Sequence, residues 1–297
     1  MASLKEIRTR ISSVKTTRQV TSAMKMVSAA KLKKAQDAIL QIRPYADKLH
    51  EILSSLSASL ENSEDSVFTQ DRNPDKVLLV LISSNRGLCG AFNSSIAKMA
   101  MDVAINKYEK QLKLGNLEFL VIGKQGEKYL KSNKLTVAGQ VNELFDNLTF
   151  ETVSDVAENV MDDFVNKKYD RVELIYNQFK NAAVQIASHE QFLPVEIKEE
   201  EQPVKKKSLV NYNFIYEPSK EYIVQELIPR SLKIQFYKAL LDSNAAEHGA
   251  RMTAMHKATD NATELIKDLT LTFNKARQAA ITNEILEVTN GAEALNG

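Results

Sequence analysis

The sequence contains little cysteine, tryptophan, glycine or proline. Its 297 residues include one cysteine, no tryptophan, nine glycines and six prolines. A single cysteine excludes an internal disulfide and a metal cage of thiolates, as is usual in a reducing compartment. We therefore expect Cys89 to be a buried, unreactive thiol.

Long apolar runs and a net charge are also missing. No stretch reaches the roughly 18 apolar residues of a membrane span, and residues 1–10 lack the apolar core of a signal peptide. Lys and Arg number 39 against 38 Asp and Glu, so the chain as a whole does not attract a polyanion. Because 43% of the residues are hydrophobic, a core can form. We expect a folded, soluble protein of the cytosol with one or two domains.

The residues that interrupt helices are concentrated in the middle of the chain. No glycine precedes Gly87 and no proline precedes Pro44, while after Pro229 only Gly249 interrupts the sequence before Gly291. Both ends can therefore form very long helices.

Both ends also carry apolar residues at alternating spacings of three and four, the heptad pattern of a coiled coil. The N-terminal pattern consists of Leu4, Ile7, Ile11 and Val14, and then of Leu32, Ala35, Ile39, Ile42, Ala46, Leu49, Leu53, Leu56 and Leu60. Between these stretches its positions are polar, and Val20, Met24 and Val27 lie on a neighbouring face, so we expect the seam to be interrupted or rotated there. The C-terminal pattern consists of Ala262, Ile266, Leu269, Phe273, Ala276 and Ala280 and, after a shift of frame, of Ile281, Ile285, Val288, Ala292 and Leu295.

A ridge of small residues, four apart, precedes the C-terminal pattern and would let another helix approach closely. Its members are Ala246, Ala250, Ala254, Ala258 and Ala262. Neither long helix can bury its apolar stripe alone, so we expect the two to pack as an antiparallel coiled coil. We predict helices over residues 1–61 and 218–297, the first opened by a capping-box pair, Ser3 and Glu6. Residues 76–210 are then a separate central domain.

The central region alternates between strand and helix patterns. We predict strands at 77–83, 117–122, 171–180 and 183–189, and helices at 93–114, capped by Asn93, and at 153–165. This order is typical of an α/β domain with a largely parallel sheet. Residues 62–75 are polar and are expected to be a linker, and 195–208 a solvated loop.

A glycine-rich turn follows the first predicted strand, where nucleotide-binding α/β folds hold phosphates. It consists of Arg86, Gly87, Leu88, Cys89 and Gly90. The sequence has neither G-x-G-x-x-G nor G-x-x-x-x-G-K-[ST], and Gly123, Lys124 and Gln125 stand where an acidic residue would contact the ribose. We therefore expect a structural turn rather than a nucleotide site.

Other candidates for chemistry are weak. The four histidines show no H-E-x-x-H or other ligand spacing, and Cys89 has no neighbouring base in the sequence. Acidic pairs such as Asp162 and Asp163 fall on the polar side of a predicted helix. We expect no catalytic, cofactor or metal site.

The N-terminal helix is strongly basic. Residues 1–34 contain nine Lys and Arg and one acidic residue, Glu6. Nucleic acid would fit such a helix, but no aromatic residue that could stack on bases precedes Tyr45. Acidic protein loops fit as well, and the charges could also be only the solvated side of a coiled coil or scaffold. The residues alone leave these interpretations open.

Motifs along the whole chain resemble the gamma subunits of bacterial-type F-type ATP synthases. In the first helix they are Lys5 to Arg8, Thr21 to Val27 and Ala30 to Leu32, and in the central turn Ser84 to Asn93. In the last helix they are Glu247 to Met255, Ala258 to Ala262, Phe273 to Gln278, and the closing residues Ile281, Thr282, Glu284, Glu287, Gly291 and Ala292.

The resemblance implies a rotor subunit without an active site of its own. Its fold would be a long antiparallel coiled coil plus a central Rossmann-like α/β domain. The coiled coil would turn inside a hexamer of alpha and beta subunits, and its angle would change their affinities for nucleotides and so couple ATP synthesis and hydrolysis to proton flow. The other implied partners are the epsilon subunit and the membrane c-ring, at the cytoplasmic side of the inner membrane, with no nucleic acid and no cofactor.

The resemblance also implies which residues contact the hexamer. These are Met24, Lys25, Arg251, Arg277, Gln278, Thr282, Glu284 and Glu287. The apolar tip at 281–295, with the start of the first helix, would turn in an apolar sleeve. Gly249 stands where the family commonly has alanine, which would weaken the helix by about 1 kcal/mol if the position is exposed. The loop 195–208 contains no cysteine pair, which excludes the thiol switch of plastid members.

Overall fold

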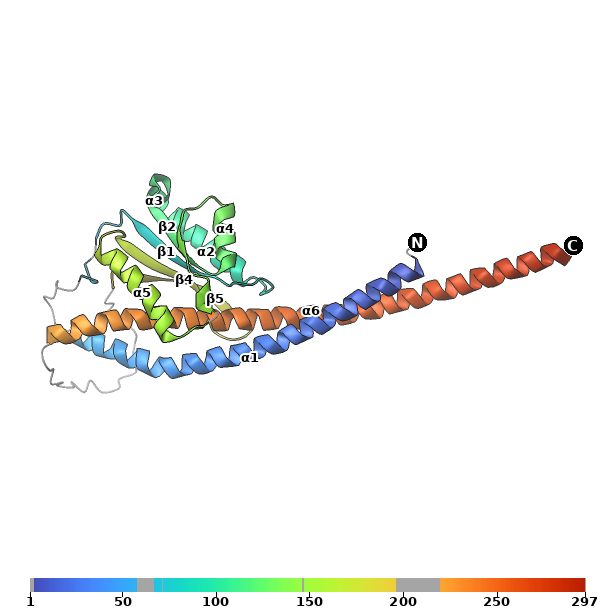
Figure 1. The fold of residues 1–297 in the computed structure, drawn as a ribbon, viewed down its shortest axis with the longest axis horizontal. Helices are drawn as coiled ribbons and strands as arrows, with labels where there is room; N and C mark the ends of the chain where they lie inside the picture. The colour runs from blue at the N-terminus through green and yellow to red at the C-terminus, as the bar shows by residue number, and fades with distance from the viewer. Residues whose placement is uncertain (1–2, 58–66, 71, 146, 196–219, 297) are drawn as a thin grey trace. The chain divides into compact units, whose positions relative to one another are not determined.

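The computed structural model describes residues 3–57, 67–70, 72–145, 147–195 and 220–296. The chain forms two compact units, residues 1–29 with 251–297, and residues 30–250. Two long helices each contribute to both units, α1 (Leu4–Ser57) and α6 (Lys220–Asn296) (Figure 1). The predicted helix ends at 58–61 and 218–219, and residues 196–210 of the predicted domain and loop, lie outside the described residues.

The first unit is an antiparallel coiled coil of the start of α1 and the end of α6, as predicted. The Arg8 guanidinium lies 5.7 Å from the centre of the Phe273 ring, and further along α1 the Thr259 hydroxyl donates to Thr21 Oγ1 at 2.9 Å. Later residues of α1 thus meet earlier residues of α6, which defines the antiparallel arrangement. At the start of α1 the Glu6 N–H donates to Ser3 Oγ, one half of the predicted capping box.

The predicted interruption of the seam on α1 is wrong. Thr21 and Ser28 continue the heptad frame and are buried, whereas Val20 and Val27 are exposed. The Thr21 hydroxyl donates to the Arg18 carbonyl at 3.0 Å, and the Ser28 hydroxyl donates to the carbonyl one turn earlier at 2.8 Å. Because these hydroxyls are satisfied by their own helix, small polar residues can fill the seam without losing hydrogen bonds.

The second unit contains a five-stranded sheet in the order β3-β2-β1-β4-β5. The strands are β1 (Val77–Ile82), β2 (Leu117–Ile122), β3 (Val137–Gln140), β4 (Arg171–Phe179) and β5 (Gln185–Leu193). All neighbouring pairs are parallel except β4 and β5. The largely parallel sheet is therefore confirmed. β3 was not predicted, because this four-residue edge strand contains Gly139 and has no continuous apolar run.

Helices cover both faces of this sheet. The helices between the strands are α2 (Phe92–Asn106), α3 (Glu109–Leu114), α4 (Lys124–Ser132) and α5 (Phe150–Val165), with a short 3-10 turn at Glu143–Phe145. On one face, Leu78, Val80 and Ile82 of β1 pack with α5 and with α6. On the other face, the alternate residues of β1 pack with α2 and α4. Burial on both faces explains why β1 reads as an unbroken apolar run.

The prediction of one helix at 93–114 capped by Asn93 is wrong in two respects. The helix stops at Asn106 and a second one starts at Glu109, because the intervening Tyr108 side chain turns inward and is buried. The N-cap is Ala91, without a side-chain cap. Asn93 instead bonds to Ser84 at the end of β1, where its amide oxygen accepts from the Ser84 N–H at 3.1 Å.

The small-residue ridge on α6 serves the central domain as well as the coiled coil. Ala246 and Ala250 pack in the second unit against Cys89, Phe179 and Phe92, the first residue of α2. In the first unit Ala262 is buried. The ridge predicted to let another helix approach closely therefore also packs against the turn at 86–90.

Candidate interaction surfaces and the central turn

In α/β folds with this strand order, phosphates bind where the order reverses, between the carboxyl ends of β1 and β4, on the turn and helix that follow β1. Here these are the turn at 86–90 and α2. The start of α4 lies against the end of β1, and its first backbone N–H groups are a second possible position for an anion. The donors and acceptors are Lys124 N–H with Asn85 Oδ1 (3.2 Å), Gln125 N–H with the Ser84 carbonyl (3.0 Å) and Gly126 N–H with Ser83 Oγ (2.9 Å). The first backbone N–H groups of α4 are thus used by the chain's own oxygens.

Two glycines bring α4 against the end of β1. A Cβ atom at Gly123, where φ is +106°, would lie 2.4 Å from the Ser83 carbonyl oxygen. A Cβ atom at Gly126 would lie 2.7 Å from Ser83 Oγ. These glycines therefore allow close packing onto Ser83, and this geometry supports the interpretation of the region as structural.

The turn from Arg86 to Gly90 is held by a buried polar cluster. The Asn93 amide donates to Cys89 Sγ at 3.1 Å and to Ser84 Oγ at 2.8 Å. Cys89 is 1% exposed, as predicted, and packs against the alanines of α6. Arg86, Gly87 and Gly90 are exposed. The turn thus packs Cys89 against α6, while its other residues face the solvent.

Leu88 at the tip of this turn escaped the sequence analysis. Its φ is +62°, which is uncommon for a residue other than glycine, and its side chain is 67% exposed. An apolar side chain held outward at a backbone cost is a feature of contact sites. The sequence shows that Leu88 lies in the turn but does not show its φ or its exposure.

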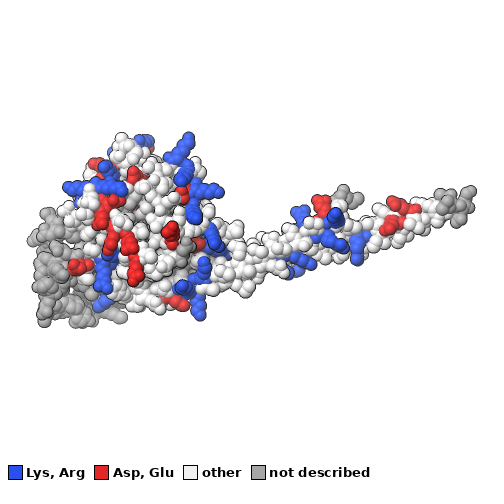
Figure 2. Space-filling model, viewed as in Figure 1, with Lys and Arg blue, Asp and Glu red and all other residues white. Residues whose placement is uncertain are grey.

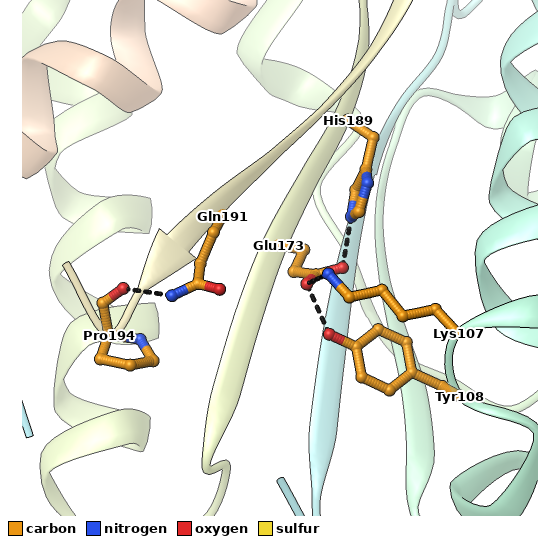
Figure 3. A network of polar contacts seen from close by, with 6 residues as sticks. All are labelled: Lys107, Tyr108, Glu173, His189, Gln191 and Pro194. Atoms are coloured by element: carbon orange, nitrogen blue, oxygen red, sulfur yellow. Dashed lines mark hydrogen bonds and ion pairs between the residues drawn. The ribbon is translucent and has the colours of Figure 1, made fainter. Parts of the chain in front are cut away.

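A second feature missed by the sequence analysis is a buried carboxylate on β4. Glu173 has no exposed surface and accepts hydrogen bonds from Lys107 Nζ (2.5 Å), from the Tyr108 hydroxyl (2.5 Å) and from His189 Nε2 (Figure 3). The donors come from the end of α2 and from β5. The network therefore joins α2, β4 and the edge strand β5 through the two carboxylate oxygens of Glu173.

The network keeps Glu173 charged. Burial by itself would raise the pKa of Glu173, but the hydrogen bonds from His189, Lys107 and Tyr108 outweigh it and lower the pKa below the ordinary 4.5. Burial and the hydrogen bond to this carboxylate raise the pKa of Tyr108 well above 10. Tyr108 is therefore a permanent donor and Glu173 a permanent acceptor near neutral pH.

The described residues contain no cluster of three His, Cys, Asp or Glu side chains that could hold a metal ion. None of the described helices is both long and apolar enough to cross a membrane.

The predicted contact residues lie on the coiled-coil unit, and most are accessible. Arg277, Gln278, Thr282, Glu284 and Glu287 are exposed on α6.

On the same unit, Met24 and Lys25 of α1 are half-buried. Lys25 Nζ lies 3.5 Å from His256 Nδ1, and this nitrogen is 3.4 Å from Asp260 Oδ2. Arg251 differs from the other predicted residues because only 7% of its surface is exposed, so little of it is available to another protein.

The same unit exposes large apolar side chains. On α1 these are Val20, Met26 and Val27, and on α6 they are Leu265, Leu271, Ile281, Ile285, Leu286 and Val288. Every residue from 277 to 292 is exposed. A helix that exposes so many apolar side chains has the surface of a protein that binds a partner.

The chain is similar to known proteins of one family. A family model described as ATP synthase matches residues 3–295. The chain is 58% identical to the ATP synthase gamma chain of Flavobacterium johnsoniae and 57% identical to that of Flavobacterium psychrophilum, and each match covers all of both chains. Among solved structures it resembles a chain of the central stalk and c-ring of Tetrahymena thermophila mitochondrial ATP synthase, with 27% identity, a TM-score of 0.57 and coverage of 80% of this chain and 99% of that one. A chain of the Euglena gracilis mitochondrial enzyme, 19% identical with a TM-score of 0.67 over 98% of this chain and 94% of that one, shares the fold.

Proposed function

This chain belongs to the ATP synthase gamma-chain family as a central-stalk rotor subunit, and we propose that its coiled coil transmits torque between a proton-driven membrane ring and a catalytic hexamer. The observation that carries this proposal is the coiled-coil unit, which buries only a narrow seam and exposes large apolar side chains along α1 and α6. Exposing apolar side chains to water costs free energy, and a surrounding sleeve of subunits would remove these side chains from water.

The unequal surfaces of the coiled coil supply the asymmetry that a rotor needs. Lys5, Arg10 and Lys15 are exposed on α1, whereas the exposed end of α6 carries Glu284 and Glu287. Each of three chemically equal catalytic sites would therefore meet a different face of the shaft. A shaft that contacts one subunit conformation better than another shifts the population of that conformation, and with it the affinity for nucleotides.

We assign the contacts as follows. Arg277, Gln278, Thr282, Glu284 and Glu287 would present polar groups to the hexamer from α6. On α1, Lys25 would present its ammonium group and Met24 an apolar side chain, near the exposed Val20 and Val27. Arg251 stays in the set, but with 7% exposure it would act mainly by holding the coiled coil in place. Ile281, Ile285 and Val288 would turn in the apolar sleeve.

The partners we propose are the alpha and beta subunits around the coiled coil, and the epsilon subunit and the membrane c-ring at the central domain. The chain itself would be non-catalytic: the turn after β1 carries neither phosphate-binding motif, and the first N–H groups of α4 are bound by Ser83, Ser84 and Asn85. It would be held at the cytoplasmic side of the inner membrane by the complex.

The proposal is tested by co-expressing the chain with the two hexamer-forming subunits of its host. We expect one copy per hexamer in a single eluting complex, and ATP hydrolysis that changes when the chain is present. A tip variant with Ile285→Asp and Val288→Asp should weaken co-elution, because two charges would enter the apolar sleeve. Leu114→Asp is the matched control, since it places a charge at an exposed leucine of the central domain. Absence of association under every nucleotide condition would refute the rotor assignment.

A further inference from the structure

Lysines are concentrated where the parallel strands begin. The segments that lead into β1, β2, β3 and β4 are residues 72–76, 107–116, 131–136 and 166–171, and together we call them the amino edge. They contain ten Lys and Arg against three Asp and Glu, in a chain whose net charge is +1. Hydrogen bonds join neighbouring segments, among them Lys76 N–H to Asp170 Oδ2 at 2.9 Å and Val77 N–H to the Asn116 carbonyl at 3.0 Å. The basic residues therefore form one surface.

The opposite edge of the sheet does not share this charge. The segments that follow the same strands, residues 83–91, 123, 141–149 and 180–184, contain two basic and two acidic residues. On the helix layer, α5 carries a line of acidic side chains, while basic side chains lie over α4 and beside α3 (Figure 2). The excess of positive charge is thus largest at the amino edge, with a further basic group over α4.

Half of the amino-edge lysines are not neutralised. Among the described residues, no carboxylate pairs with Lys76, Lys110, Lys134 or Lys167, and all four are exposed. The other four are paired, namely Lys107 with Glu173, Lys113 with Glu109, Lys131 with Glu127 and Lys168 with Asp163. The Arg72 guanidinium stacks on the Phe164 ring and donates a hydrogen bond to the Phe164 carbonyl oxygen. The free charge is therefore carried by lysine.

One apolar side chain stands among these lysines. Leu114 closes α3 directly before Gly115 and is 75% exposed, the largest exposed fraction of any large apolar residue in the described chain. It is separated by one turn of helix from Lys110 and is adjacent to Lys113. Most of this apolar side chain is therefore in contact with water.

We propose that the amino edge binds anionic phospholipid headgroups at a membrane surface. Four adjacent strand starts about 4.8 Å apart make a broad row rather than a pocket, which suits a planar array of phosphates. Lysine is depleted in protein interfaces, whereas clusters of lysine beside an exposed apolar side chain are typical of membrane-surface contacts. Leu114 would enter the headgroup layer between them. This contact goes beyond the proposed rotor contacts and does not rest on them.

The first test is co-sedimentation of the full chain with vesicles. At about 0.15 M salt we expect binding to vesicles that contain phosphatidylglycerol and none to pure phosphatidylcholine. Reversal of the four free lysines (Lys76→Glu, Lys110→Glu, Lys134→Glu and Lys167→Glu) should lower the partition coefficient about tenfold or more. The matched control reverses four exposed residues of α1 (Lys5→Glu, Arg10→Glu, Lys15→Glu and Lys31→Glu) and should lower it less than about twofold. Equal losses in the two variants, or no binding of the unmodified chain, would overturn the proposal.

The second test uses the absence of tryptophan, which makes a single introduced indole a clean reporter. In Leu114→Trp the emission should shift to the blue on anionic vesicles and be quenched by brominated lipid. In Leu271→Trp, an exposed leucine of α6 in the coiled-coil unit, it should not change. Quenching in Leu271→Trp alone would place the contact on the coiled coil and refute the amino edge. Because both leucines are exposed, neither variant should perturb folding.

Discussion

Gly249 of α6 lies directly against Ala182 in the turn between β4 and β5. A Cβ atom at position 249 would be 3.2 Å from the Ala182 Cα and 3.4 Å from its carbonyl oxygen and from Phe179 Cε2. Glycine in a helix normally costs about 1 kcal/mol relative to alanine. This cost was expected for an exposed position, but position 249 is buried. The close approach of α6 to the turn, which glycine allows, offsets the cost.

Substitution of Gly249 should therefore depend on size. Gly249→Ala should change the free energy of unfolding little, since about 1 kcal/mol of helix propensity opposes the crowding at Ala182. Gly249→Val should lower it by about 1–3 kcal/mol, because the added methyl groups have no space. Urea denaturation followed by circular dichroism measures both. Gly291→Val is the control, since nothing lies within 4 Å of a Cβ atom there; an equal loss at both positions would contradict the packing explanation.

Gly123 should tolerate substitution far less well than Gly87. Gly123→Ala combines a positive φ with a Cβ atom 2.4 Å from the Ser83 carbonyl oxygen, so we expect a loss of about 2–4 kcal/mol. Gly87→Ala meets no atom within 4 Å and should be close to neutral. Thermal melting of the two variants decides the matter. A stable Gly123→Ala would show that α4 can move away from β1.

Glu173 should make stability depend on pH in the acid range. Its pKa is lower in the folded chain than the ordinary 4.5, so its contribution is fully present above pH 4.5 and is lost as the pH falls through the lowered pKa. Glu173→Gln should remove this part of the acid dependence. At pH 7 it should cost about 2–4 kcal/mol, because Lys107, Tyr108 and His189 lose a charged acceptor.

The measurement is the free energy of unfolding of the two proteins from pH 7 to acid. Glu109→Gln is the matched control because it breaks an exposed ion pair with Lys113, and such pairs contribute little. Parallel pH profiles of the unmodified chain and Glu173→Gln would exclude Glu173 as the source.

The hydroxyl pair in the coiled coil should be replaceable by methyl groups. Thr21→Val together with Thr259→Val keeps the shape of both side chains and removes both hydroxyls, so stability should be unchanged or raised by up to about 1 kcal/mol. Thermal melting of the full chain measures it. A clear loss would mean that the 2.9 Å bond between the two hydroxyls stabilises the seam directly.

Arg277 and Gln278 should affect turnover without affecting the fold. Arg277→Glu with Gln278→Ala should lower ATP hydrolysis of the reassembled complex by at least about fivefold, the lower end of a typical coupling between sites. Helix content of the isolated chain should not change, because both residues are exposed. Lys275→Glu with Asn274→Ala, also exposed, is the matched control. Normal hydrolysis by the first variant would remove both residues from the proposed contacts.

Much of this architecture follows from local pattern. The heptad spacing predicted both long helices and their antiparallel pairing, since only mutual packing buries two such stripes. The apolar runs at 77–83 and 117–122 predicted the two central strands because both of their faces are covered. Two short elements were missed, the four-residue β3 and the nine-residue α4.

The candidate sites divide in the same way. The motifs from Thr21 to Val27 and from Phe273 to Gln278 could be recognised from the sequence because they are continuous along a helix. Glu173 could not, since its partners Lys107, Tyr108 and His189 come from separate elements and no spacing relates them.

The sequence by itself determined the two long helices, the α/β centre and the family, because each is written in residues close together along the chain. Only the tertiary structure decided which polar residues are buried, that Ser83, Ser84 and Asn85 bind the first N–H groups of α4, and that lysines from four segments share one edge. These features depend on distances between residues far apart in sequence. Such distances are set by how the strands align and how the helices pack, and no local pattern records them.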